Sequence, residues 1–174
     1  IPPGLDTYFD YSDQHGLDGA VEMCNGAGVC RKLQGGTMCP SYQATLDERH
    51  STRGRGNALR LAITGQLNRP DDINSTQKPP ASRWNDPGTI ETLNLCLSCK
   101  ACKTECPSNV DISRLKSEYT AQGMKAAGRV PFQAAIFGAI RTLNRLGSLT
   151  PRLANVISST PPARWVAKKL LHID

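Results

Sequence analysis

Four cysteines in one short run are the residues of this sequence best suited to chemistry. Cys96, Cys99, Cys102 and Cys106 follow the spacing C-x2-C-x2-C-x3-C, and Pro107 comes directly after the last of them. Three thiolates spaced in this way can surround one cubane iron–sulfur cluster, whereas a fourth thiolate followed by proline characteristically ligates a different cluster. The run therefore requires further ligands from elsewhere in the chain.

The remaining cysteines supply those ligands. Cys24, Cys30 and Cys39 precede the run, and Cys39 is again followed by a proline. If each Cys-Pro ligand crosses to the other motif, Cys106 joins Cys24 and Cys30. The same exchange predicts one complete [4Fe–4S] site with four thiolates: Cys39, Cys96, Cys99 and Cys102.

The second site is one cysteine short. In the complete motif the second ligand lies three residues after the first, and here that position is Ala27. Three outcomes stay open: a [3Fe–4S] cluster, a [4Fe–4S] cluster with a non-cysteine ligand such as water, a carboxylate or His, or no second cluster. Zinc is an alternative metal for all of these cysteines. Structural zinc sites, however, typically use two separated C-x2-4-C knuckles rather than one uninterrupted run.

Basic side chains stand beside these cysteines. Arg31, Lys100 and Lys103 are candidates for balancing the negative charge of bound clusters. Further along, His50 is either a ligand or a satisfied hydrogen-bonding residue. Arg53 and Arg55 are forked donors suited to a carboxylate, a flavin phosphate or a partner surface.

Composition limits the function classes. The chain has 174 residues, 39% of them hydrophobic and 5% aromatic, which predicts a thin helical core stabilised by clusters. Seven cysteines without a secretory segment indicate a reducing, cytoplasmic compartment. The net charge of +6 is not massed in one run, so nucleic-acid binding is not predicted. No catalytic triad, carboxylate pair or phosphate loop stands out, so we expect this chain itself to be non-catalytic.

The pattern predicts an all-α fold with two cysteine-motif loops between short helices. Residues 1–20 form an irregular leader, and 21–127 form the cluster-binding domain, with a linker-like insertion at 70–88. A helix face is expected within 57–67. Asp86 followed by a proline predicts a helix up to residue 95, and Asp111 is expected to cap another helix.

The last part of the chain, 128–174, is predicted to form additional helices. The apolar stretch 131–146 is too short and too interrupted to span a bilayer, which favours core or partner packing. Residues 162–171 form a basic amphipathic helix candidate. This helix would touch a membrane surface peripherally, or link to a further domain downstream.

The cysteine motifs resemble those of the C-terminal α-helical ferredoxin domain of the succinate dehydrogenase and fumarate reductase iron–sulfur subunit. In that family one motif also lacks its second cysteine, and a [3Fe–4S] cluster lies beside a [4Fe–4S] cluster. The sequence around the motifs, with the segment 50–55, is similar more specifically to FAD-linked D-2-hydroxyacid dehydrogenases of the D-lactate or D-2-hydroxyglutarate type. Iron–sulfur subunits of glycolate oxidase and glycerol-3-phosphate dehydrogenase are related.

The resemblance implies an electron-transfer domain. Electrons from an FAD domain, expected in the same polypeptide before residue 1, would pass through the clusters to a quinone or a carrier protein. Two alternatives remain: a separate iron–sulfur subunit of a quinone-linked dehydrogenase, and a structural iron–sulfur module at a partner interface. The related subunits of the glycolate oxidase type carry two complete motifs, so Ala27 marks a departure from them.

Overall fold

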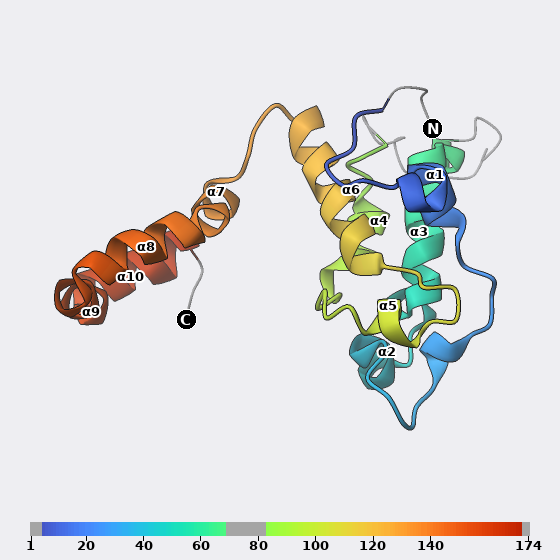
Figure 1. Ribbon diagram of the computed structural model, residues 1–174, viewed down its shortest axis with the longest axis horizontal. Helices are drawn as coiled ribbons and strands as arrows, with labels where there is room; N and C mark the ends of the chain where they lie inside the picture. The colour runs from blue at the N-terminus through green and yellow to red at the C-terminus, as the bar shows by residue number, and fades with distance from the viewer. Residues whose placement is uncertain (1–4, 69–82, 172–174) are drawn as a thin grey trace. The chain divides into compact units, whose positions relative to one another are not determined.

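A computed structural model describes residues 5–68 and 83–171, and the chain divides into two compact units, 1–127 and 128–174 (Figure 1). The described residues contain helices and no strand, which confirms the predicted all-α fold. The first unit contains four short 3-10 turns, η1 (Ser12–Gln14), η2 (Val29–Arg31), η3 (Glu48–His50) and η4 (Gln66–Asn68), and the helices α1 (Leu17–Glu22), α2 (Pro40–Thr45), α3 (Thr52–Thr64), α4 (Pro87–Asn94), α5 (Ala101–Glu105) and α6 (Ile112–Ala126).

The core of this unit lies where α3 packs against α1, α4 and α6. Leu59 and Ile63 on α3 and Leu115 and Tyr119 on α6 are at most 2% exposed. The helix predicted within 57–67 begins five residues earlier, because the Ser51 hydroxyl accepts a hydrogen bond from the Gly54 amide and caps it. This early start places the residues just after Ser51 on the helix.

Both predicted caps around the cysteine run are confirmed. The Asp86 carboxylate accepts the Thr89 amide at 2.7 Å, and Asp111 accepts the Arg114 amide at 3.0 Å. Each such cap contributes about 1 kcal/mol to helix stability. Together they fix the start of α4 and the start of α6, so the cysteine run lies between two capped helices.

The leader is more ordered than predicted. Residues 17–22 form α1, and Tyr11 is buried with the Arg114 guanidinium 4.1 Å from its ring centroid. The amides of Tyr8 and Phe9 donate to the carboxylate of Glu118 on α6. An irregular leader was therefore the wrong prediction for 17–20, since Leu17 and its neighbours bury an apolar face against α3.

The predicted linker 70–88 lies mostly outside the described residues, and its end belongs to the core. Trp84 is 9% exposed and packs on Tyr119, with ring centroids 5.8 Å apart. The Tyr119 hydroxyl donates to the Arg83 carbonyl and accepts from the Asp86 amide. The linker prediction is wrong for 83–88, because the Trp84 side chain and the hydrogen bonds of Tyr119 anchor this segment to α6.

The second unit consists of short helices with little interior. Its helices are α7 (Phe132–Gly138), α8 (Ile140–Leu149), α9 (Pro151–Ser159) and α10 (Pro161–Leu171). Small residues lie where α8 and α9 meet; a Cβ on Gly147 would lie 3.8 Å from that of Ala154. The large apolar side chains stay exposed, among them Leu149 at 74% and Val156 at 62%. The apolar stretch 131–146 therefore builds no core among the described residues of this unit.

In the part of the chain that the structure describes, no helix combines the length and apolar character needed to cross a membrane.

Candidate metal centres

Two small cavities in the first unit are lined by cysteines. One is lined by Cys39, which precedes α2, and by three cysteines of the run, Cys96, Cys99 and Cys102. The other is lined by the remaining three: Cys24, Cys30 and Cys106. These two groups are the same sets that the exchange of Cys-Pro ligands predicts.

The thiols are all free, and each cavity combines sheltered and exposed ones. Cys39 is buried in the four-cysteine cavity, whereas Cys99 is exposed. In the three-cysteine cavity, Cys30 is buried and Cys24 is exposed. Each site therefore has one ligand edge toward solvent, where electrons could enter or leave, and one edge in the core.

The two ligand loops share a backbone conformation. In the loop after Cys96, the second and fourth residues, Ser98 and Lys100, have φ values of 53° and 61°. In the loop after Cys24, the same positions are Gly26 and Gly28, with φ values of 78° and 74°. In both loops a helical turn follows directly: η2 begins just before Cys30, and α5 begins just before Cys102. The loops are thus equivalent position by position.

This equivalence places Ala27 where the complete loop has Cys99. Ala27 lines the three-cysteine cavity, so this cavity has three thiols and, at the position equivalent to Cys99, a methyl group. The Ala27 amide donates to the Asn25 side chain at 3.0 Å, which closes the turn locally. The first loop therefore has the shape of a complete motif but lacks the sulfur at one corner.

Cys39 has the most elaborate surroundings of the seven. Its backbone is left-handed, with φ 53°, and Pro40 immediately begins α2, so the side chain is turned away from the helix. The Thr52 hydroxyl lies 2.8 Å from the Cys39 sulfur. Burial raises the pKa of the Cys39 thiol, and the contact with Thr52 acts in the opposite direction. An empty site would hold this thiol protonated, so iron binding must drive its ionisation.

Charged groups stand near the other ligands of the four-cysteine cavity. The Lys116 ammonium donates to the Cys96 carbonyl at 2.8 Å. Burial also raises the pKa of the Cys102 thiol, as does the negative charge of Asp111. Asp111 is 4% exposed, and its second carboxylate oxygen has no hydrogen-bond partner among the described residues.

The helix α5 joins the two cavities. Cys102 and Cys106 lie four residues apart on or beside it, which is about 6 Å along the helix axis. Between them, Glu105 accepts hydrogen bonds from the Thr37 amide at 2.7 Å and the Thr37 hydroxyl at 2.8 Å, and it pairs with Lys32. The Lys32 contact is the main reason why the pKa of Glu105 falls to about 2. This carboxylate therefore ties the loop that leads to Cys39 to the helix that carries Cys106.

The basic residues that the sequence singled out lie in different places. Lys100 lines the four-cysteine cavity. Arg31 pairs instead with Glu48, at 2.9 Å. Lys103 lies on α5, and neither cysteine cavity includes it in the part of its lining that the structure describes.

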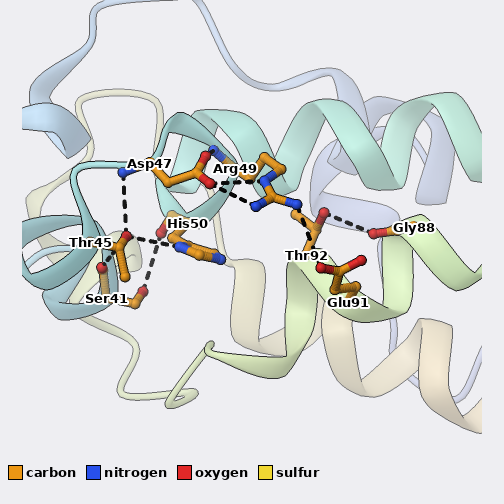
Figure 2. A network of polar contacts seen from close by, with 8 residues as sticks. All are labelled: Ser41, Thr45, Asp47, Arg49, His50, Gly88, Glu91 and Thr92. Carbon is orange, nitrogen blue, oxygen red and sulfur yellow. Dashed lines mark hydrogen bonds and ion pairs between the residues drawn. The ribbon is translucent and has the colours of Figure 1, made fainter.

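His50 takes part in a polar network rather than in a cysteine cavity (Figure 2). Its ring Nδ1 lies 2.8 Å from the Thr45 hydroxyl, and its carbonyl accepts a hydrogen bond from Ser41. Arg49 extends the network from η3 to Glu91 on α4, at 3.6 Å. The network fixes α2 and α4 around the start of α3, which supports the hydrogen-bonding interpretation of His50.

The two arginines of segment 50–55 differ sharply. Arg53 pairs with Glu48 at 2.8 Å, and its side chain is 37% exposed. Arg55 is 3% exposed and lines the four-cysteine cavity together with Thr52. The sequence did not reveal this inward position, nor the role of Thr52. The only available signal was helical spacing, because Arg55 lies three positions after Thr52 and residues at this spacing share one face of a helix.

An open cleft lies beside the exposed thiol Cys24. Its volume is about 610 Å³, and its lining includes Glu22, Arg53, Asn57 and Arg60. Acidic, basic and neutral polar side chains thus lie around Cys24, the exposed ligand of the three-cysteine site.

The residues fit iron–sulfur clusters better than a single metal ion. Among the described residues, no three His, Cys, Asp or Glu side chains converge closely enough to hold one ion. A cubane instead binds each thiolate through a different iron atom, and the cysteines here surround two separate cavities. Left-handed turns, buried thiols and hydrogen-bond donors at the sulfur positions are suited to such clusters. The fold and the site together define a helical iron–sulfur protein.

Comparison with known proteins gives the family. The family model described as "4Fe-4S dicluster domain" matches residues 20–110, which include all seven cysteines. The chain belongs to this family, and its role is iron–sulfur electron transfer.

Among curated proteins, D-2-hydroxyglutarate dehydrogenase of Escherichia coli (strain K12) is 26% identical over 174 aligned positions, which cover 87% of this chain and 17% of the relative. The D-2-hydroxyglutarate dehydrogenase of Pantoea ananatis (strain AJ13355) is 30% identical, covering 58% of this chain and 12% of the relative. A probable glycolate oxidase iron-sulfur subunit of Bacillus subtilis (strain 168) is 28% identical, covering 58% and 18%.

The chain thus spans less than a fifth of the length of these relatives. No solved structure matches it. The predicted resemblance to dehydrogenases of the D-2-hydroxyglutarate type and to the glycolate oxidase iron–sulfur subunit is confirmed.

Proposed function

We propose that the chain holds a [4Fe–4S] cluster on Cys39, Cys96, Cys99 and Cys102, and a [3Fe–4S] cluster on Cys24, Cys30 and Cys106. The observation that carries this proposal is the methyl group of Ala27 at the corner that Cys99 occupies in the equivalent loop. A cubane site without its fourth thiolate can lose that iron and persist with three. Cys24 and Cys30 keep the same six-residue separation as Cys96 and Cys102, which supports a cluster of similar size in the first loop.

Iron and sulfide analysis with EPR on anaerobically purified protein tests this assignment. We expect about seven iron atoms per chain and an oxidised [3Fe–4S] signal. About eight iron atoms without that signal would instead indicate a second [4Fe–4S] cluster with a non-cysteine ligand. About four iron atoms would mean that one site stays empty. Either of the last two results contradicts the proposal.

The electrons relayed by this domain come, in our proposal, from a flavin domain that oxidises a D-2-hydroxyacid. The names of two relatives support this source: D-2-hydroxyglutarate dehydrogenase and probable glycolate oxidase iron-sulfur subunit. The relatives are more than five times as long as the region matched here, which leaves room for an FAD domain in the same polypeptide. The exposed thiols Cys24 and Cys99 offer one edge of each cluster to such a domain and to an acceptor, a quinone or a carrier protein.

A reduction experiment separates this relay from a purely structural role. If the 2-hydroxyacid bleaches the cluster absorption of the holoprotein and dithionite gives the same change, the relay is supported. Clusters that neither reductant alters would indicate a structural module. A dissociable subunit would show the same bleaching only when a separate flavoprotein is added.

The second unit suggests a peripheral contact as a further candidate. Seven of the 21 Lys and Arg residues lie in 128–174, against one of the 15 Asp and Glu residues, so residues 1–127 carry fourteen of each sign. The whole net charge of +6 thus belongs to the unit whose apolar side chains are exposed. Basic amphipathic helices of this kind bind anionic membrane surfaces.

Vesicle co-sedimentation tests this contact. We expect the holoprotein to bind vesicles that contain anionic lipid and not vesicles of zwitterionic lipid alone, and binding to weaken with salt. If the holoprotein binds neither kind of vesicle, another part of the polypeptide covers this unit instead. A cytoplasmic location, at the inner face of the membrane, is consistent with seven free thiols.

A further inference from the structure

Arg55 is a buried cation in contact with the four-cysteine cavity. It lies in the first turns of α3, is 3% exposed, and lines that cavity together with Cys39 and Thr52. A guanidinium in such a position has lost nearly all of its hydration. Its charge must therefore be compensated by the protein or by something that the protein binds.

The hydrogen-bond partners of Arg55 are neutral. Its Nε donates to the Thr92 carbonyl at 3.2 Å, and one terminal nitrogen donates to the Ser41 hydroxyl at 2.8 Å. Both acceptors are held in place, since Ser41 donates to the His50 carbonyl and the Thr92 hydroxyl donates to the Gly88 carbonyl (Figure 2). These contacts orient the guanidinium but supply no negative charge, and they use two of its five N–H donors.

No carboxylate pairs with Arg55 in the part of the chain that the structure describes, although other basic residues of the region do have such partners. Arg53, two residues earlier, pairs with Glu48 at 2.8 Å, and Arg49 pairs with Asp47 at 2.8 Å. Those two arginines are exposed or partly exposed, where an ion pair matters least. The arginine that most needs a counter-charge is thus the one without a carboxylate.

The missing counter-charge is available in the cavity itself. A cubane held by four thiolates is an anion overall, and its negative charge increases by one on reduction. The cavity wall shared by Arg55 and Cys39 would bring the guanidinium next to that anion. The carbonyl of Thr92, near the end of α4, adds only the partial charge of a helix C-terminus.

We propose that Arg55 is the buried counter-charge of the [4Fe–4S] cluster, and that it raises the reduction potential of this cluster by stabilising its reduced form. The neutral hydrogen bonds to Thr92 and Ser41 hold the guanidinium in position, and its charge acts on the cluster. The inference rests on the proposed ligand set of that site. In agreement with it, the charge of Arg55 lowers the pKa of the Cys39 thiol, against the larger effect of burial.

Three other charges lie near the same ligands, and none of them replaces Arg55. Lys116 approaches the Cys96 carbonyl and is only partly buried. Asp111 is buried near Cys102 and has the opposite sign, so it opposes the effect of Arg55. Lys100 lines the cavity but is exposed at its mouth. Arg55 is therefore the one among these four that joins positive charge with full burial.

Redox titration of the holoprotein, followed by EPR, tests the role of Arg55. Arg55→Met removes the positive charge and keeps a side chain of similar length. Arg55→Lys keeps the charge and removes the forked guanidinium group. Arg53→Gln is the control, because Arg53 has Glu48 as its carboxylate partner. We expect the midpoint potential of the [4Fe–4S] signal to fall in Arg55→Met and to stay close to the wild-type value in Arg55→Lys and Arg53→Gln. In the two Arg55 variants, the three-cysteine cluster should change less than the four-cysteine cluster. Arg53 lines the three-cysteine cavity, so any effect of Arg53→Gln should be confined to that cluster.

An unchanged potential in Arg55→Met with full iron content would overturn the proposal. If Arg55→Met fails to retain the cluster, the Arg55→Lys variant is the deciding measurement. A cluster retained at the wild-type potential in Arg55→Lys supports a requirement for positive charge. Loss of the cluster in both variants shows that only the hydrogen bonds of Arg55 matter, which contradicts the proposal. The wild-type spectrum separates the two levels of inference. Wild-type protein without a [4Fe–4S] signal contradicts the ligand assignment, whereas a normal signal with an unshifted Arg55→Met contradicts only the role of Arg55.

Discussion

The hydroxyl of Thr52 lies 2.8 Å from the sulfur of Cys39, and both side chains are buried. When Cys39 is an iron-bound thiolate, the hydroxyl must be the donor, because the sulfur carries no proton. Hydrogen bonds to cluster sulfurs raise the reduction potential.

Thr52→Val should therefore lower the midpoint potential of the four-cysteine cluster. Valine keeps the shape and removes the donor, at a cost of about 1 kcal/mol for the lost hydrogen bond. Potentiometric titration monitored by EPR measures the shift. Thr64→Val, on the same helix with its hydroxyl on the Arg60 carbonyl at 2.6 Å, is the control and should leave the potential unchanged. Equal shifts in both variants would contradict a direct effect on the sulfur.

Cys39→Ser and Cys106→Ser should damage opposite clusters. Loss of Cys39 should abolish the [4Fe–4S] signal and spare the three-cysteine cluster, because Cys39 lies in the cavity of the later motif. Loss of Cys106 should do the reverse. Iron analysis and EPR of the two purified variants measure the difference. If each variant loses the cluster of its own motif, the ligands are not exchanged.

Ala27→Cys should complete the three-cysteine site. The equivalent position in the other loop carries Cys99, and the two loops share left-handed residues at their second and fourth positions. We expect iron to rise from about seven to about eight atoms per chain, with loss of the oxidised [3Fe–4S] signal. Ala27→Ser, a weaker ligand of similar size, is the control. An unchanged signal together with one extra titratable thiol in Ala27→Cys would show that the fourth corner is out of reach.

Asp111→Asn should raise the midpoint potential of the four-cysteine cluster. The carboxylate is buried near Cys102, so its negative charge disfavours the reduced, more anionic cluster. Asparagine is as good an N-cap as aspartate, so α6 should remain intact. Asp86→Asn, which alters the equivalent cap of α4, controls for helix effects. A fall in potential, or equal shifts in both variants, would speak against an electrostatic origin.

The sequence was informative where short-range chemistry decides the outcome. Helix caps need only one carboxylate at the right place, so Asp86 and Asp111 could be recognised directly. Cysteine spacing and the two Cys-Pro pairs were sufficient to group the seven thiols as they line the two cavities. Both kinds of signal extend over a few residues and depend little on the rest of the fold.

Features that depend on distant contacts escaped prediction. Trp84 lies in a stretch rich in turn-forming residues, and only its contact with Tyr119, 35 residues later, shows that the segment is anchored. Arg55 was indistinguishable from Arg53 by type and neighbourhood. Their different surroundings follow from the position of Ser51, whose hydroxyl begins α3 and thereby rotates Arg55 inward.

The left-handed residues of the two ligand loops imply that the empty sites behave differently. A left-handed conformation costs about 1 kcal/mol or more for a residue with a side chain and almost nothing for glycine. The loop with Ser98 and Lys100 therefore carries backbone strain that bound iron can offset, whereas the loop with Gly26 and Gly28 carries no such strain but loses more conformational entropy when it is ordered. Cluster assembly thus has a different cost at each site: backbone strain at the four-cysteine site, and the ordering of a glycine-containing loop at the three-cysteine site.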